Sequence, residues 1–226
     1  MFPGIIVNIF LPENHKRVPR IFCVLVVCLA MDIGPKTSDA HDWVSDQVGI
    51  SSQQGQLFGI TSGEGIARLV LRAGEQVVVM EAKGVTGFVQ TTTRLIGFSG
   101  KLQRWVPFSI STSERILKWS LTPRMIIVQG QQATYGFQSD GARWKREPWG
   151  AGESLQHSAV KNSIAVMVTD RRALGFSAFT GGFFSRDLPV GNPIQDIQIN
   201  DNVVILHLSD FMLVFRSGLA IWAELP

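Results

Sequence analysis

The sequence predicts an all-β protein built from a repeat of 39 residues, and three observations lead to this prediction. A Gly-Phe pair recurs at Gly97, Gly136 and Gly175, and Val214-Phe215 continues the same step. A large aromatic residue follows eight positions after each of these residues: Trp105, Trp144, Phe183 and Trp222. No segment after residue 41 shows the apolar period of an α-helix over three turns. The repeat therefore predicts extended strands.

The first forty residues are expected to form a leader that is separate from the fold. Basic residues between His15 and Arg20 precede an apolar run of eleven residues, 21–31, and Ser38 and Ala40 offer small side chains for a cleavage site. A membrane span needs about 20 apolar residues, so we expect a secretory signal peptide, export to the periplasm or the exterior, and no stable transmembrane segment after cleavage. The alternatives are a retained short anchor or a buried element of the domain.

Composition narrows the class of protein. The 226 residues are 45% hydrophobic and 17% charged, which argues against disorder, and the net charge of +3 is too small and scattered for a dedicated nucleic-acid binder. Both cysteines, Cys23 and Cys28, fall in the leader, which excludes thiol chemistry in the chain that follows. No motif for a cofactor, a metal or a nucleophilic serine is found, so we expect no cofactor and no metal.

A decayed unit comes first among the repeats. Gly49-Ile50 and the segment 57–60 match Gly87-Phe88 and the segment 95–98 at a step of 38 residues. Because terminal repeats are commonly atypical, we count five units from about residue 41, with four as the alternative.

Each later unit contains four short extended runs. In the third unit they are expected at 114–121, 124–129, 134–138 and 143–147, separated by turn residues. In the fourth unit, 164–168 is a continuous apolar run, as for a strand buried on both faces. In the fifth unit, 194–199 alternates in part, as for a strand with one exposed face.

Four strands in each unit of about 40 residues are the plan of a β-propeller blade. The layout resembles that of WD-repeat and quinoprotein-type propellers over residues 41–226, without indicating a specific family. The resemblance implies a single propeller domain of about five four-stranded blades. The Gly-Phe pairs are expected in the third strand, where the glycine admits a ring from the neighbouring blade, and the second aromatic column is expected to cover the blade edge. The alternative is a ligand-stacking role.

The candidate binding site rests on a polar column with the same step, formed by Glu75, Glu114, Glu153 and Asn192. If the first strand of each unit is innermost, these side chains surround the mouth of a central channel. Nearby second turns would add four residues on the same face: Asp170, Arg171, Arg172 and Asp210. Such a group could bind a cation or a basic partner, or supply acid/base groups. The alternative is a repeated turn contact in which each Glu accepts hydrogen bonds from backbone amides.

The sequence thus favours an exported, monomeric scaffold that binds a protein or a polysaccharide and has no enzymatic activity. The alternative is a carbohydrate-active enzyme or a lectin that uses the acidic loops at the channel mouth.

Overall fold

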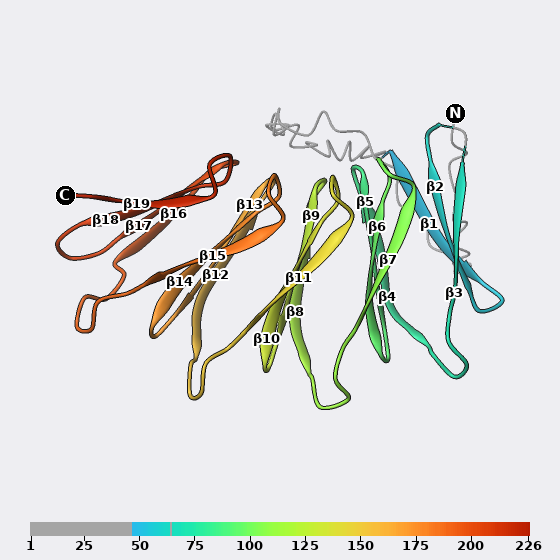
Figure 1. Cartoon of the computed structure of the whole chain (residues 1–226), viewed down its shortest axis with the longest axis horizontal. Coiled ribbons are helices and arrows are strands. Elements are labelled where there is room, and N and C mark those ends of the chain that lie inside the picture. The colour runs from blue at the N-terminus through green and yellow to red at the C-terminus, as the bar shows by residue number, and fades with distance from the viewer. Residues whose placement is uncertain (1–46, 64) are drawn as a thin grey trace, which may run out of the picture. The chain divides into compact units, whose positions relative to one another are not determined.

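A computed structural model describes residues 47–63 and 65–226, which form nineteen β-strands and no helix (Figure 1). The expected leader and its cleavage site lie outside these residues. The strands belong to five antiparallel sheets, in each of which the strands follow chain order. The first sheet contains β1 (Val48–Gln53), β2 (Gln56–Thr61) and β3 (Ile66–Val70). The second contains β4 (Val77–Lys83), β5 (Thr86–Thr91), β6 (Arg94–Ser99) and β7 (Arg104–Ser109).

The remaining three sheets have four strands each. The third contains β8 (Ile116–Leu121), β9 (Met125–Gly130), β10 (Ala133–Gln138) and β11 (Arg143–Pro148). The fourth contains β12 (Leu155–Lys161), β13 (Ile164–Thr169), β14 (Arg172–Ser177) and β15 (Gly182–Asp187). The fifth contains β16 (Asp196–Ile199), β17 (Val203–His207), β18 (Met212–Arg216) and β19 (Ile221–Leu225).

These sheets confirm the predicted all-β fold and the count of five blades. The four strands expected in the third unit are β8 to β11, with bounds shifted by two residues at most. Strand β13 is buried along its whole length, and β16 alternates between exposed and partly buried positions, as expected. The described part of the first sheet departs from the plan because it has three strands; Gly49 and Gly87, which the repeat aligns, lie in β1 and β5, so β1 is the second strand of its unit.

The sheets stack face to face in chain order, and the core lies between them. In Figure 1 they form a row, with the first and the fifth sheet at opposite ends. Contacts join each sheet to the next through equivalent strands, as between β4 and β8 or β13 and β17. Four-stranded antiparallel sheets packed in this order are β-propeller blades.

The Gly-Phe pairs pack the sheets together as predicted. A Cβ atom added at Gly97 would lie 2.6 Å from the ring of Phe137 in the next sheet, so only glycine leaves room for that ring. The same relation joins Gly59 to Phe98, Gly136 to Phe176 and Gly175 to Phe215. All four rings are fully buried. Each phenylalanine therefore fills the space that a missing side chain leaves on the preceding sheet.

The second aromatic column covers the outer strands and adds a hydrogen bond between sheets. The indole Nε1 of Trp144 donates to the carbonyl oxygen of Val106 at 2.8 Å, and that of Trp222 donates to Phe184 at 2.8 Å. Trp105 donates in the same way to Ala67 at 3.2 Å. Phe183 replaces the tryptophan in the fourth sheet and packs on Phe176, with ring centroids 4.8 Å apart. The column thus has the packing role that the repeat predicts.

Among the described residues, the structure has no helix of the length and apolar character that a membrane crossing requires.

Candidate functional site

Each sheet has two ends that differ in their loops. The hairpin end holds the turns between the first and second strands and between the third and fourth strands of each unit. The linker end holds the turns between the second and third strands and the segments that join one sheet to the next. The predicted polar column lies at the linker end, where each member is the residue of a tight turn whose N–H donates to the carbonyl three positions earlier.

Glu75 is buried in a network of hydrogen bonds at the linker end of the second sheet. Arg94 donates from Nε to Oε1 at 2.8 Å and from Nη2 to Oε2, and the backbone N–H of Arg72 donates to Oε2 at 2.8 Å. Thr91 donates its hydroxyl to Oε1 at 2.5 Å. The bonds from Arg94, Thr91 and Arg72 outweigh the effect of burial and lower the pKa of Glu75 from its usual 4.5 to about 2.

Glu153 repeats this arrangement in the fourth sheet. Arg172 donates from Nε to its Oε1 at 2.8 Å, and the backbone N–H of Gly150 donates to Oε2 at 2.5 Å. Burial acts to raise the pKa of Glu153, but the hydrogen bonds from Arg172 and Gly150 outweigh it and hold the pKa below its usual value. Arg172 also donates to Glu147 Oε1 at 2.7 Å, so it ties the outer strand of the third sheet to the fourth sheet.

The other two members of the column use different partners. Glu114 accepts the hydroxyl of Tyr135 at 2.6 Å and the backbone N–H of Gln132 at 3.0 Å. Burial and the hydrogen bond to Glu114 raise the pKa of Tyr135 to about 12. Asn192 accepts the backbone N–H of Ser209 at 2.8 Å. Position by position, the column bonds to the turn between the second and third strands of its own sheet, or to the strand beside it.

The residues predicted from the second turns do lie at the linker end. Asp170 accepts the backbone N–H of Ser154 at 2.9 Å, and Asp210 accepts the side-chain N–H of Asn192 at 3.2 Å. Arg171 follows Asp170 in the same turn, and its N–H donates to Thr169 at 3.2 Å. The structure therefore brings Arg172 to Glu153 and Asp210 to Asn192. These hydrogen bonds are those that the turn-contact interpretation predicts, and ligand binding by the column stays a prediction.

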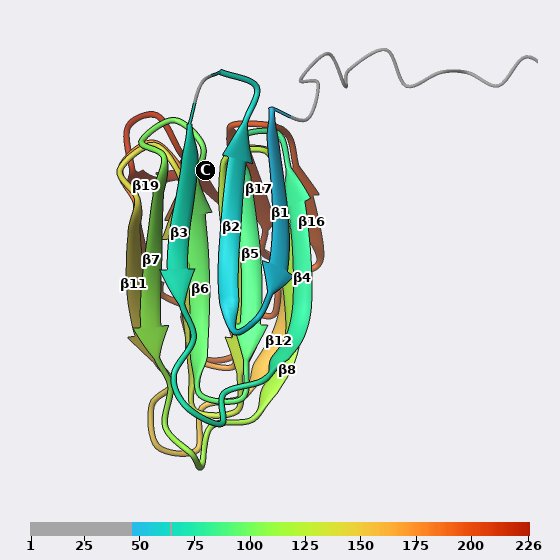
Figure 2. The same ribbon diagram turned by 90° about the vertical axis from the view of Figure 1, so that its right-hand side faces the viewer.

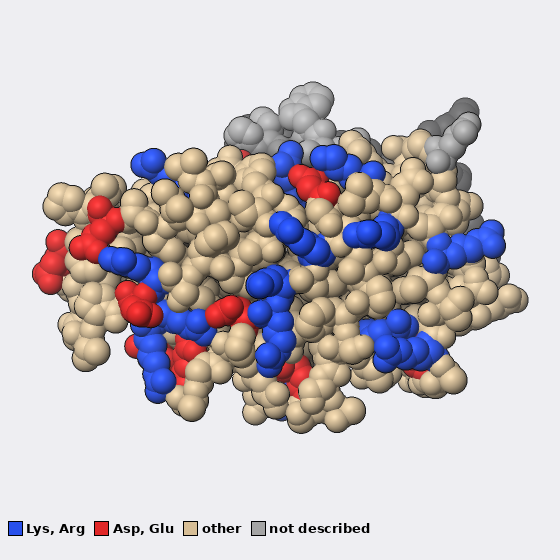
Figure 3. All heavy atoms as spheres, viewed as in Figure 1, with Lys and Arg blue, Asp and Glu red and all other residues tan. Residues whose placement is uncertain are grey.

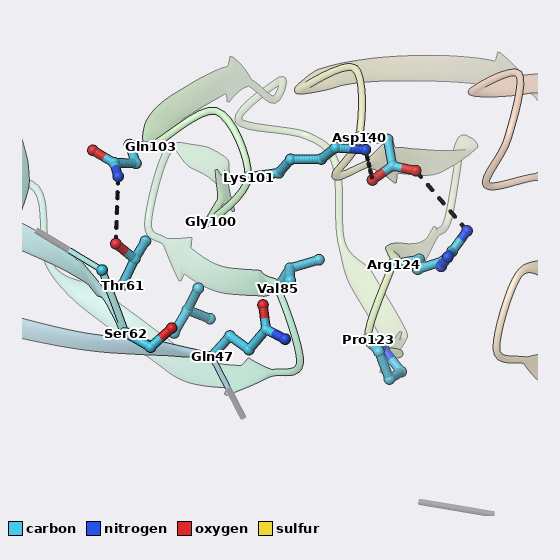
Figure 4. Close-up of a pocket in the computed structure, with 12 residues that line it drawn as sticks. Gln47, Thr61, Ser62, Val85, Gly100, Lys101, Gln103, Pro123, Arg124 and Asp140 are labelled. Carbon is cyan, nitrogen blue, oxygen red and sulfur yellow. Dashed lines mark hydrogen bonds and ion pairs between the residues drawn. The ribbon is translucent and has the colours of Figure 1, made fainter. Parts of the chain in front are cut away.

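A groove of about 560 Å³ opens at the hairpin end across the first three sheets (Figure 4). Its walls are turns: the start of β1, the turns after β2, β4, β6, β8 and β10. Hydrogen bonds between sheets hold these turns in place, since the N–H of Gln47 donates to Gly84 at 2.9 Å and that of Val85 to Pro123 at 3.2 Å. The groove is therefore a built feature of the stack and not a gap between mobile loops.

The groove carries more positive than negative charge. Lys101 Nζ lies 3.4 Å from Asp140 Oδ1, and Arg124 Nη1 lies 4.0 Å from Oδ2 of the same carboxylate. The side chains of Lys101 and Arg124 are 63% and 47% exposed, so most of their N–H donors face solvent. Figure 4 shows the three charged groups together, with the polar side chains of Gln103 and Thr61 on the opposite side. Two cations that share one carboxylate leave a net positive charge for a ligand.

Sequence reasoning did not find this groove. Its residues come from five different turns and share no repeat column, because Lys101, Arg124 and Asp140 occupy different turn types in two sheets. The only signal in the sequence was the recurrence of polar residues at turn positions, which is common to all turns. Stacking of the sheets brings them together.

On the face that Figure 3 shows, Lys and Arg side chains occur along the row, and Asp and Glu side chains lie among them. That face is therefore mixed in charge, in keeping with the scattered charges of the sequence.

No protein-family model and no curated protein matches the chain. Among solved structures, it is similar to the N-terminal domain of Nup159 at 9% identity and a TM-score of 0.33, over 75% of this chain and 55% of that one. It is similar to Prp20p from Saccharomyces cerevisiae at 8% identity and a TM-score of 0.36, over 76% and 56% of the two chains. The Neurospora crassa Pan2 WD40 domain matches at 10% identity and a TM-score of 0.32, over 79% and 62%.

The aligned part of the chain thus spans little more than half of the length of these structures. At such TM-scores the likeness adds nothing to the fold that the five sheets themselves display.

Proposed function

We propose that this chain is an exported binding scaffold that holds an acidic segment of a partner protein in the groove at its hairpin end. The observation that carries the proposal is the pair of exposed cations, Lys101 and Arg124, that share the carboxylate of Asp140 inside a preformed groove. A volume of about 560 Å³ lies in the range of roughly 300–1,000 Å³ that ligand sites occupy.

The chemistry of the groove favours a carboxylate-bearing ligand. A partner carboxylate can accept N–H donors of Lys101 and Arg124 and neutralise the excess charge, while Gln103, Thr61 and Ser62 offer further polar contacts along the wall. The rigid turns limit the entropy lost on binding, which favours affinity. Because the cations are exposed, their contribution is expected to fall with added salt.

The test is a peptide array of acidic, neutral and basic sequences, probed beside a glycan array with the same purified full chain. We expect binding to acidic peptides and at least a tenfold loss of affinity when Lys101 and Arg124 are both changed to Ala. The matched control changes Arg115 and Lys118, which are exposed and lie outside the groove, to Ala; it removes the same charge and should leave binding unchanged.

Equal loss in both double variants would show that only the net charge matters and would reject the groove. Binding to glycans alone would instead favour the carbohydrate alternative.

Export is a separate part of the proposal and is supported by the basic and apolar segments of the first forty residues. N-terminal sequencing of protein from the producing cell should begin near His41. An intact N-terminus on a cytosolic protein would contradict it.

A further inference from the structure

The two ends of the row of sheets carry the residue positions that join one sheet to the next. Inside the row, a projecting face bears the buried phenylalanine and the second aromatic residue, and a receiving face bears the glycine and the carbonyl that accepts the indole N–H. Every interface between neighbouring sheets pairs one projecting face with one receiving face. A row of five sheets must therefore leave one projecting face and one receiving face without a neighbouring sheet.

The first sheet leaves the projecting face open. Gly59 faces the second sheet, so Ile60 beside it faces away, and Ile66 pairs with Ile60 across the strands on the same outer face. By register these two isoleucines hold the positions of Phe98 and Trp105 in the next sheet. Phe98 and Trp105 are buried, whereas Ile60 and Ile66 are 45% and 59% exposed.

The same outer face continues along the first sheet. Val70 in β3 is 66% exposed, and Arg68 stands over the ring of Phe58 at 5.7 Å from its centroid. Register places both beside the isoleucines: Arg68 pairs with Phe58, and Val70 pairs with Gln56. Figure 2 looks onto this sheet, with β1, β2 and β3 in front of the others.

The fifth sheet leaves the receiving face open. Phe215 packs against Gly175 of the fourth sheet, so Val214 beside it faces away from the row. Val214 takes the place of the receiving glycine, and Ala223, which pairs with it, takes the place of the residue that accepts the indole N–H. Ile205 pairs with Val214 on the other side, and Ile221 and Leu225 on the same face are 53% and 40% exposed.

We propose that the open face of the fifth sheet receives the open face of the first sheet of a second copy of this chain, head to tail. The contact would continue the interface that already joins the sheets, strand over equivalent strand. The substitutions at the two ends compensate in size: the projecting Phe becomes the smaller Ile60, and the receiving Gly becomes the larger Val214. The two faces of one chain lie at opposite ends of its row, so the partner face comes from another copy (Figure 1).

Such a contact joins two different surfaces, and repeated copies either close into a ring or extend as a chain. It differs from the monomer that the sequence led us to expect. It also removes from water two apolar sheet faces that an isolated row exposes.

Mixed cross-linking of the full chain tests the proposal. In a Cys23→Ser, Cys28→Ser background, which removes both native cysteines, one tagged population carries Ile60→Cys and a differently tagged population carries Val214→Cys. A short bismaleimide cross-linker should yield a product that contains both tags, and neither population alone should yield a covalent dimer. A chain that carries both substitutions and cross-links only within itself would overturn the proposal in favour of a closed ring of five blades, and so would the absence of any cross-link.

Sedimentation provides an independent test. The unmodified full chain should sediment above its single-chain mass of 24.9 kDa, and Ile66→Asp should weaken the association at least tenfold without lowering the thermal midpoint. Val190→Asp is the matched control, because Val190 is fully exposed in the linker between β15 and β16 and should leave the association intact. A chain that stays at 24.9 kDa at all concentrations, or equal effects of the two variants, would overturn the proposal.

Discussion

The interior sheets and the two terminal sheets are built from the same strands but differ at the residues that face a neighbour. In the interior, Phe137 and Gly136 are both required, since one fills a space on the preceding sheet and the other leaves a space for the next ring. At the ends, Ile60 and Val214 stand at these two positions. The difference shows that the repeated residues are set by contact with a neighbouring sheet and not by the needs of the strand itself.

The polar column at the linker end shows the same contrast. Glu75 and Glu153 in interior sheets hold arginines in ion pairs, whereas Asn192 in the fifth sheet forms only uncharged hydrogen bonds and one with Asp210. Arg172 reaches the outer strand of the preceding sheet as well. Ionic contacts at this end therefore belong to the interior of the stack.

The largest expected effect comes from removal of an interior ring. Phe137→Ala should lower the free energy of unfolding by about 4 kcal/mol, because it empties a fully buried site between two sheets. Ile60→Ala, at the exposed equivalent position, should cost less than about 1 kcal/mol. Denaturant unfolding of the full chain at low protein concentration measures both, and similar costs would contradict the contrast between interior and end.

Filling a receiving glycine should have the next largest effect. Gly136→Ala places a Cβ atom against the ring of Phe176 and should destabilise the fold by about 3 kcal/mol. Gly49→Ala is the control in the first sheet: nothing lies within 4 Å of its added Cβ, so a neutral result or a gain of about 0.5 kcal/mol is expected. Thermal and denaturant unfolding would report both, and a neutral Gly136→Ala would show that the sheets can separate without cost.

A smaller effect is expected from the interior ion pair. Glu75→Gln should cost about 2 kcal/mol at neutral pH, because it weakens charge-assisted hydrogen bonds to Arg94. The pKa of Glu75 falls from 4.5 to about 2 on folding, so the contribution of the carboxylate is complete above about pH 4.5 and is lost as the pH falls toward 2. The difference between the wild type and the variant should therefore shrink in that window. Asn192→Ala, in the fifth sheet, should show no such pH dependence.

The smallest effect is expected at Glu114, whose change also separates the two interpretations of the polar column. Glu114→Gln keeps an oxygen for the hydroxyl of Tyr135 and removes the charge, so the cost should be about 1 kcal/mol. Unchanged binding with a lowered thermal midpoint would assign the column a structural role. Loss of binding at an unchanged midpoint would instead support a ligand site at the linker end.

The sequence by itself determined the strands, their order and their inner faces. A step of 39 residues placed Gly97, Gly136 and Gly175 at equivalent points, and local alternation identified strands such as β13. This worked because each blade is a meander of neighbouring strands, so its hydrogen bonds join residues close in the sequence. The pairing of Arg172 with Glu153 was also within reach, since both lie in one unit.

Only the tertiary structure decided which surfaces meet across different units. The groove joins Lys101 of the second sheet to Arg124 and Asp140 of the third, although these residues share no repeat position. The row also revealed that Ile60 and Val214 stand at open faces, which a periodic pattern cannot show because a period is the same for a ring and for a row. The physical reason is that strand pairing is specified by local pattern, whereas the neighbours of a whole sheet depend on how five sheets stack.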